Sequence, residues 1–98
     1  MSADIEQINI EFHNRANTQF FFACNNFQTA IKTIDRVKEE FLYQQIREKH
    51  IKTLQQQLTM LAKEIIKTNQ DHKQLNQVDQ NLQRFLKEYL HRFVQKVN

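Results

Sequence analysis

The helical architecture of this chain is set by residues 5–41, IEQINIEFHNRANTQFFFACNNFQTAIKTIDRVKEEF. Apolar residues recur in this stretch at every third or fourth position, which is the periodicity of a helix with one buried side. From Phe20 to Phe41 the steps alternate between three and four residues, the repeat of helices that wrap around one another. The stripe predicts a long N-terminal helix with coiled-coil-like packing, and it comprises Ile5, Ile8, Phe12, Ala16, Phe20, Ala23, Phe27, Ala30, Ile34, Val37 and Phe41.

Glycine and proline are both absent from the 98 residues. A chain of this length and average composition would contain about seven glycines and about five prolines. Tight β-hairpins and glycine-rich phosphate loops depend on these residues, so their absence predicts an all-α fold. The length is that of one domain, and we expect residues 1–98 to form a single helical unit.

Helices are expected over residues 3–42, 46–68 and 71–97. The first begins beside Ser2 or Asp4, both of which are good N-terminal caps. A second apolar stripe restarts after a stretch with few aliphatic residues and runs through Ile51, Leu54, Leu58, Leu61 and Ile65. The third helix has a broad apolar face that widens toward its end.

The second and third helices are expected to form an antiparallel hairpin with its turn near residues 69–71. Asn69 tolerates the left-handed conformation that often follows a helix. Asp71 and Gln74 have the spacing of a capping box for the next helix. Together these signals predict an elongated three-helix bundle.

The length of the first helix conflicts with a compact monomer. A continuous helix over residues 3–68 would be about 100 Å long, whereas a compact domain of this size has a radius of gyration near 13 Å. A compact chain therefore needs a turn within residues 24–50, and the candidates are Asn25–Asn26 and the region of Gln44. Otherwise the molecule is elongated and packs against a second chain.

The side chains that could carry chemistry are scattered. Cys24 is the only cysteine, which excludes an internal disulfide and fits a reducing compartment. Glu88 and His91 have the spacing used by di-iron bundles, but such a site needs a second motif; Glu88 also stands four residues before Arg92, the spacing of a surface ion pair. We therefore expect no catalytic residue, no metal and no cofactor, and a non-enzymatic protein.

No run of apolar residues approaches the roughly 18 that a membrane span requires. Residues 1–15 contain Asp4, Glu6 and Glu11 in place of the basic start of a targeting segment. We expect a soluble, cytoplasmic protein.

Three consecutive aromatic residues stand out because a helix cannot bury them all on one side. Phe20 belongs to the apolar stripe, Phe21 lies on its flank and Phe22 lies on the opposite side. This belt predicts contact with several neighbours, and hence a partner. The residues expected in that interface are Phe20, Phe21, Phe22, Phe27, Phe85, Tyr89 and Phe93. The expected function is that of an adaptor, chaperone or assembly subunit that packs its helices against another helical protein, as a homodimer or a hetero-oligomer.

Two other functions fit the sequence less closely. The net charge is +3, from 14 basic and 11 acidic residues. A small regulator could therefore bind nucleic acid through Lys49, Lys52, Lys63, Lys67 and the basic C-terminal tail. The basic residues are interspersed with acidic ones, however, and no recognition motif is present. The other alternative is a phage-borne or plasmid-borne antagonist that occupies a groove of a host protein.

Overall fold

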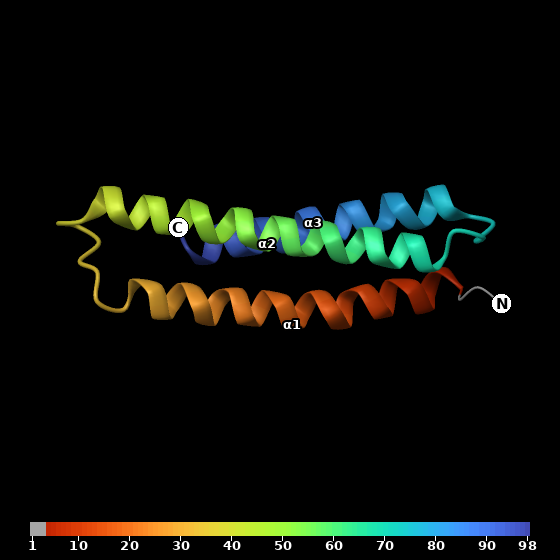
Figure 1. Cartoon of the computed structure of the whole chain (residues 1–98), viewed down its shortest axis with the longest axis horizontal. Coiled ribbons are helices and arrows are strands. Elements are labelled where there is room, and N and C mark those ends of the chain that lie inside the picture. The colour runs from red at the N-terminus through yellow and green to blue at the C-terminus, as the bar shows by residue number, and fades with distance from the viewer. Residues whose placement is uncertain (1–3) are drawn as a thin grey trace.

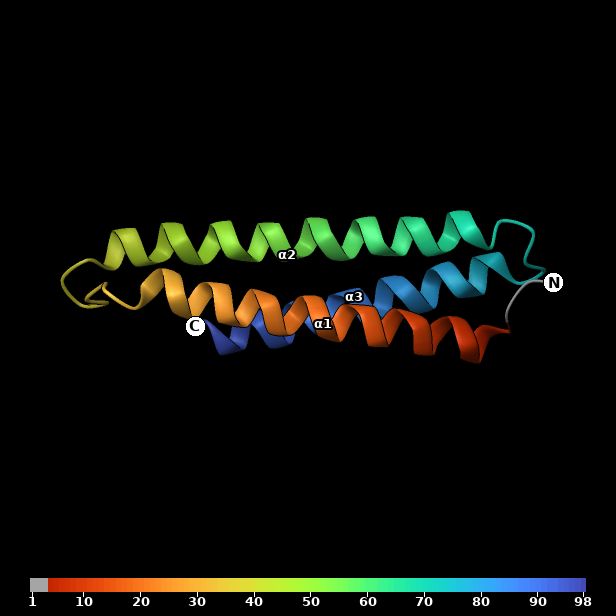
Figure 2. The ribbon, with the colours of Figure 1, turned by 60° about the horizontal axis from the view of Figure 1, so that its bottom comes forward.

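The computed structural model describes residues 4–98 and contains three α-helices, α1 (Ile5–Ile31), α2 (Glu40–Thr68) and α3 (Leu75–Lys96). They lie side by side and run up, down and up, so that α2 is antiparallel to both of its neighbours (Figure 1; Figure 2). The predicted all-α bundle is confirmed, including its long N-terminal helix. The molecule is elongated, measuring 55 × 18 × 17 Å. Within residues 4–98 none of the helices combines the length and the hydropathy needed to cross a bilayer.

The core follows the predicted stripes along most of the rod. From α1 it contains Ile8, Phe12, Ala16, Ala23 and Phe27, and from α2 it contains Tyr43, Leu54, Leu58, Leu61, Ala62 and Ile65. The α3 residues are Val78, Leu82, Leu86, Tyr89 and Phe93, and Val97 follows directly after the helix. Aromatic rings meet edge to face near the end of α1, where Phe27 packs on Phe93 and Tyr43 with ring centroids 6.4 and 5.8 Å apart.

The predicted extent of the first helix is wrong, because α1 ends at Ile31 and not at residue 42. The turn lies between residues 32 and 39, inside the expected window. It falls at neither expected position, since α1 continues through Asn25–Asn26 and Gln44 is already within α2. Val37 and Phe41, which continue the apolar periodicity, are 88% and 77% exposed.

Asp35 organises the turn before α2, which contains no glycine or proline. Its carboxylate Oδ1 accepts hydrogen bonds from the backbone N–H groups of Val37 and Lys38, at 3.0 and 3.1 Å. The Glu39 carboxylate in turn accepts from the N–H of Asp35 at 3.3 Å. These reciprocal bonds satisfy the free amides that precede α2, as a capping box does at a helix start.

The turn and the first residues of α2 hold the end of the chain that follows α3. The Tyr43 hydroxyl donates to the backbone carbonyl of Val97 at 2.7 Å, and the side chain of Tyr43 is buried. The Arg36 guanidinium lies over the Tyr43 ring, 4.7 Å from its centroid, and reaches the carbonyl of Asn98 at 3.5 Å. Carbonyls at the end of α3, which have no partner within the helix, are satisfied in this way.

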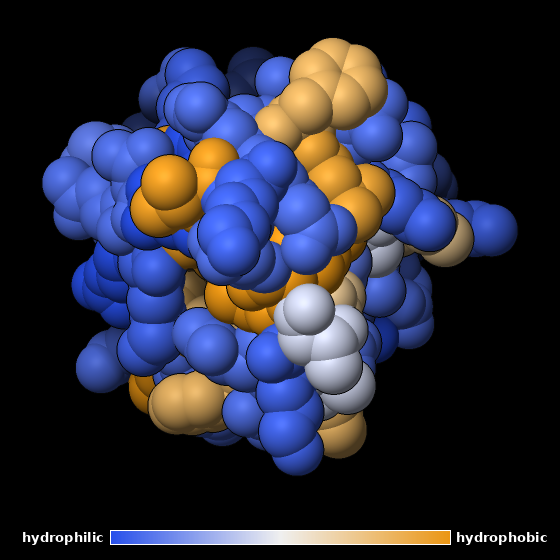
Figure 3. All heavy atoms as spheres, turned by 90° about the vertical axis from the view of Figure 1, so that its left-hand side faces the viewer, coloured by the Kyte–Doolittle hydropathy of each residue, from blue (hydrophilic) through white to orange (hydrophobic). Residues whose placement is uncertain are grey.

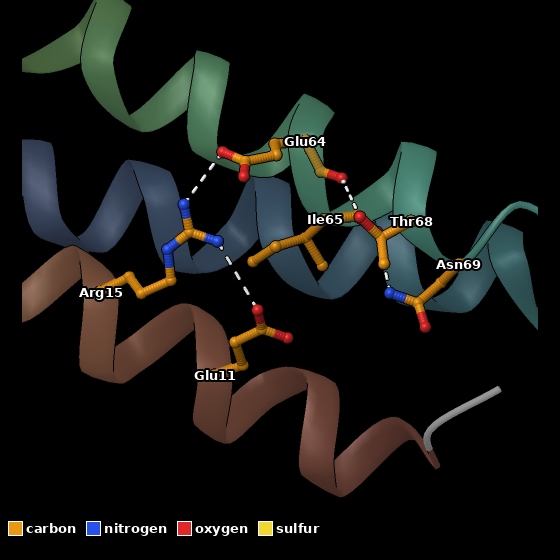
Figure 4. Close-up of polar contacts among 6 residues, drawn as sticks. All are labelled: Glu11, Arg15, Glu64, Ile65, Thr68 and Asn69. Atoms are coloured by element: carbon orange, nitrogen blue, oxygen red, sulfur yellow. Dashed lines mark hydrogen bonds and ion pairs between the residues drawn. The ribbon is translucent and has the colours of Figure 1, made fainter.

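The hairpin between α2 and α3 is confirmed, but its chemistry differs from the prediction. Asn69 is not left-handed, because its φ is −116°. Its buried side-chain amide instead donates to the carbonyl of Ile65 at 2.8 Å and so caps the C-terminal end of α2 (Figure 4). The α3 helix begins at Leu75, so Asp71 and Gln74 do not form the predicted capping box; the N–H of Gln74 donates to Nδ1 of His72.

The start of α1 agrees with the prediction at Asp4. Its carboxylate accepts from the N–H of Gln7 at 2.8 Å, while the Gln7 side chain accepts from the N–H of Asp4 at 3.3 Å. This is a complete capping box. Ser2, the alternative cap, and residue 3, the expected first residue, lie outside the described residues.

Candidate partner-binding surface

The structure divides the predicted interface residues into three groups. Phe27, Tyr89 and Phe93 belong to the core, enclosed by the chain's own helices. Phe20 and Phe85 are half-buried and pack against that core. Phe21 and Phe22 are 64% and 63% exposed. Of the seven residues, these last two therefore offer the largest free aromatic surface.

The two half-buried rings border the α1–α3 contact. The Phe20 ring lies 6.1 Å from that of Tyr89 and 6.3 Å from that of Phe93, measured between centroids. Phe85 packs against His13 at 4.3 Å. These rings close the edge of the core, so their main contacts are within the chain.

Tyr89 has a structural role in the same contact. Its hydroxyl donates to Oδ1 of Asn17 at 3.1 Å and lies 3.0 Å from Nδ1 of His13. Because the single hydroxyl proton is used toward Asn17, Nδ1 of His13 must be the donor in the second bond. Burial raises the pKa of Tyr89 from its ordinary value, with Arg92 opposing and Glu88 adding to the shift. The neutral phenol thus ties α3 to α1.

The exposed part of α1 has an unusual composition. Between Arg15 and Lys32 the chain contains no Asp, Glu, Lys, Arg or His. This uncharged stretch covers about 24 Å of helix. Charged residues are depleted at the centres of protein interfaces, and aromatic residues are enriched there. This absence of charge is visible in the sequence, and it marks the exposed side of α1, which the apolar stripe alone does not identify.

Eight side chains form the exposed side of α1, which we call the α1 outer face. They are eight of the exposed residues of α1 and its C-terminal cap, with spacings of three or four residues around the Phe21–Phe22 pair: Glu11, Asn14, Thr18, Phe21, Phe22, Asn25, Thr29 and Lys32. In Figure 2, α1 lies at the front of the bundle and no other helix crosses in front of it. The face is apolar at its centre, amide- and hydroxyl-bearing around it, and charged only at its ends.

One edge of the α1 outer face is fixed by an ion-pair bridge. Arg15 contacts Glu11 on its own helix at 3.5 Å and Glu64 on α2 at 2.9 Å (Figure 4). A shallow surface depression of about 320 Å³ lies beside this bridge, between α1 and α2. It is lined by Arg15, Gln19, Gln57, Met60, Leu61 and Glu64. The charged groups of Glu11, Arg15 and Glu64 are all well exposed. We therefore expect the ion-pair bridge to contribute only about 0–1 kcal/mol per pair.

A second apolar patch lies at the end of the rod that carries the α1–α2 turn. Val37, Phe41 and Leu42 are exposed there. Viewed from this end, apolar side chains gather around the centre with hydrophilic side chains over part of them (Figure 3). Charged residues of both signs flank the patch in sequence, in contrast to the uncharged surroundings of Phe21 and Phe22.

The candidate chemical groups are not brought together. Among residues 4–98 no three His, Cys, Asp or Glu side chains are grouped as metal ligands would be. Glu88 and His91 are both exposed. The predicted ion pair of Glu88 with Arg92 is absent from this part of the chain, and Arg92 instead lies over the Tyr89 ring at 5.4 Å. Cys24 is half-buried, and burial raises the pKa of its thiol, with Lys96 opposing the shift.

The fold and the α1 outer face define a class of protein: a three-helix bundle that leaves one uncharged, aromatic helix side exposed. Comparison of the chain with protein-family models, with curated proteins and with solved structures found no match.

Proposed function

We propose that the protein is a non-enzymatic interaction module that binds a helical protein through the α1 outer face. The observation that carries this proposal is the exposure of two adjacent phenylalanines within a helix stretch that contains no charge. Isolated exposed apolar residues are common on soluble proteins. A contiguous aromatic site with its charges excluded has the composition of an interface core.

Binding would be driven by removal of the two rings from water. Complete burial of an exposed phenylalanine contributes about 1.5–3 kcal/mol, and aromatic residues in a desolvated centre often dominate an interface. A helix is the matching partner, because a straight rod about 10–12 Å wide presents a ridge that fits between or along other helices. The surrounding Asn and Thr side chains can donate and accept hydrogen bonds at the rim.

This mechanism suits an adaptor, a chaperone or an assembly subunit. All three need a stable scaffold with a binding surface that is independent of its core. The bundle meets that requirement, because Phe27 and Phe93 hold the core together from the inner sides of α1 and α3, while Phe21 and Phe22 take no part in that cluster.

We expect substitution of both exposed rings, F21S/F22S, to abolish partner capture while leaving the fold intact. The test is affinity capture from an extract of the cells in which the protein occurs, with the retained proteins quantified by mass spectrometry. Each ring is already more than half exposed, so we expect thermal unfolding to change little.

Phe41→Ser is the matched control, since it removes an exposed phenylalanine from the other apolar patch. Proteins retained by the wild type and F41S but lost with F21S/F22S would support the proposal. Retention of the same proteins by all three chains would contradict it.

Nucleic-acid binding is a second candidate function, and the arrangement of lysines on α2 favours it. Lys49, Lys52, Lys63 and Lys67 are exposed and share one side of the helix. Among residues 4–98 the ion pairs all involve Arg15, so these four ammonium groups have no carboxylate within pairing distance. Four phosphate contacts would give a slope of about −3.6 in log affinity against log salt for duplex DNA. Titration of labelled duplex DNA at several salt concentrations measures this slope, and absence of binding at low salt would remove the candidate.

A further inference from the structure

The α1 outer face has the same spacing when read in either direction. Its eight positions form four pairs, each with numbers that add to 43: Glu11 with Lys32, Asn14 with Thr29, Thr18 with Asn25, and Phe21 with Phe22. All eight side chains are exposed on one side of a continuous helix; only Lys32, its C-terminal cap, lies just beyond Ile31. A two-fold axis between Phe21 and Phe22 would therefore place each position opposite its pair in a second copy.

We propose that the occupant of the α1 outer face is a second copy of this chain, with the two α1 helices antiparallel and crossing at Phe21 and Phe22. The inference rests on the proposed function, because it names the partner of the same surface. The proposed pair has a defined orientation, antiparallel, and a defined register, with Phe21 opposite Phe22.

Charge complementarity carries the choice of partner and direction. In the antiparallel pair each Glu11 lies opposite Lys32 of the other copy, so both ends of the contact join opposite charges. A parallel pair in register would place Glu11 against Glu11 and Lys32 against Lys32, which is repulsive at both ends. Residues 16–31 are uncharged, so the middle of the contact carries no charge; Arg15 lies at its edge, where it is already paired with Glu11 and with Glu64 of α2.

The uncharged positions are also complementary. Phe21 meets Phe22 of the second copy, so four rings form the centre of the contact. Thr18 meets Asn25, and Asn14 meets Thr29; a hydroxyl and a carboxamide can each donate and accept, so either partner can supply the proton. Polar residues at facing positions of paired helices fix the register more than they add affinity.

The first experiment measures the molar mass of the chain in solution by light scattering and sedimentation equilibrium, from about 10 μM to about 1 mM, a range suited to dissociation constants near these values. We expect a monomer–dimer equilibrium for the wild type. F21S/F22S should weaken it by about a hundredfold or more, since the central rings are lost. Glu11→Lys should weaken it by about tenfold or more at low salt, because it replaces attraction with repulsion at both ends.

Compensation separates the charge pair from general effects of substitution. The double variant E11K/K32E exchanges the two charges and should restore dimerisation to near the wild-type level. Glu48→Lys is the matched control, because Glu48 is exposed on α2 and is absent from the α1 outer face. It should leave the equilibrium unchanged. Failure of E11K/K32E to restore the dimer, with E11K weakened, would overturn the register.

The second experiment tests orientation by disulfide trapping in a Cys24→Ala background. Thr18→Cys and Asn25→Cys lie opposite each other across the proposed axis, so a mixture of the two chains should form a covalent heterodimer on mild oxidation. Two copies of Thr18→Cys would have their cysteines offset by about 10 Å along the axis, beyond the Cα separation of about 7 Å that a disulfide allows. Efficient trapping of Thr18→Cys with itself would overturn the antiparallel pair.

The outcomes distinguish this inference from the proposed function. A wild-type chain that stays monomeric at about 1 mM would overturn the second copy as occupant, while loss of partner capture in F21S/F22S would still support the α1 outer face as an interaction surface. A dimer that F21S/F22S does not weaken would overturn the inference, and unchanged capture with that variant would overturn the proposed function.

Discussion

Replacing Phe93 by alanine should lower the free energy of unfolding by about 3–5 kcal/mol, the usual effect of removing a fully buried phenylalanine. Phe93 is 0% exposed, and its ring meets those of Phe20 and Phe27 edge to face. Domains of this size are stable by only about 5–15 kcal/mol, so the variant should lose a large part of its stability. The urea midpoint of helix unfolding, followed by circular dichroism at several denaturant concentrations, measures the change.

Phe21→Ala provides the control for the same chemical change on the surface. Phe21 is 64% exposed, and we expect its truncation to alter stability by no more than about 0.5 kcal/mol in the monomer. The comparison must be made at a protein concentration well below that of any dimerisation. Equal destabilisation by the two variants would mean that the core is not centred where the structure places it.

The variant Tyr43→Phe should be destabilised by about 1–3 kcal/mol, although it removes a single oxygen atom. The hydroxyl donates to the carbonyl of Val97 in a buried environment, and a buried acceptor left without its donor costs about this amount. The phenylalanine ring still fills the space and still lies beneath Arg36. Amide exchange should therefore increase mainly in the last turn of α3, and the urea midpoint should fall.

The equivalent change at Tyr89 is its control. The Tyr89 hydroxyl bonds to Asn17, which is exposed, and to His13, which is half-buried. Water can replace the lost bond for those groups, so Tyr89→Phe should have the smaller effect. A larger loss in Tyr89→Phe than in Tyr43→Phe would contradict the proposed role of the turn in holding α3.

The fold class and most of the core could be predicted from the spacing of apolar residues. Most of the stripe from Ile8 to Phe27 is buried as expected, with Phe20 half-buried, because each helix must cover one apolar side. The position of the first turn could not be predicted, because Val37 and Phe41 continue the helical spacing through it. In the sequence Asp35 resembles the other charged residues around it, and only the structure shows its bonds to the following amides. Whether residues 32–39 continue the helix or form a turn depends on contacts between residues distant in sequence, such as that between Tyr43 and Val97.

The candidate surface was predictable in part. Three consecutive phenylalanines cannot all face one side of a helix, and the structure leaves Phe21 and Phe22 exposed. The predicted interface also included Phe27, Tyr89 and Phe93, which the bundle needs for its own core. Helical spacing alone does not distinguish a side that packs within the chain from one that packs on a partner. The absence of charge between Arg15 and Lys32 supplies that distinction for α1, and it requires no structure to observe.

The three-helix arrangement also suggests where probes can be attached to the molecule. Because α1 and α3 run in the same direction, Asp4 and Asn98 lie toward opposite ends of a rod 55 Å long (Figure 1). Fluorophores attached near these two residues would be held apart along the rod, and unfolding of the bundle would change the energy transfer between them.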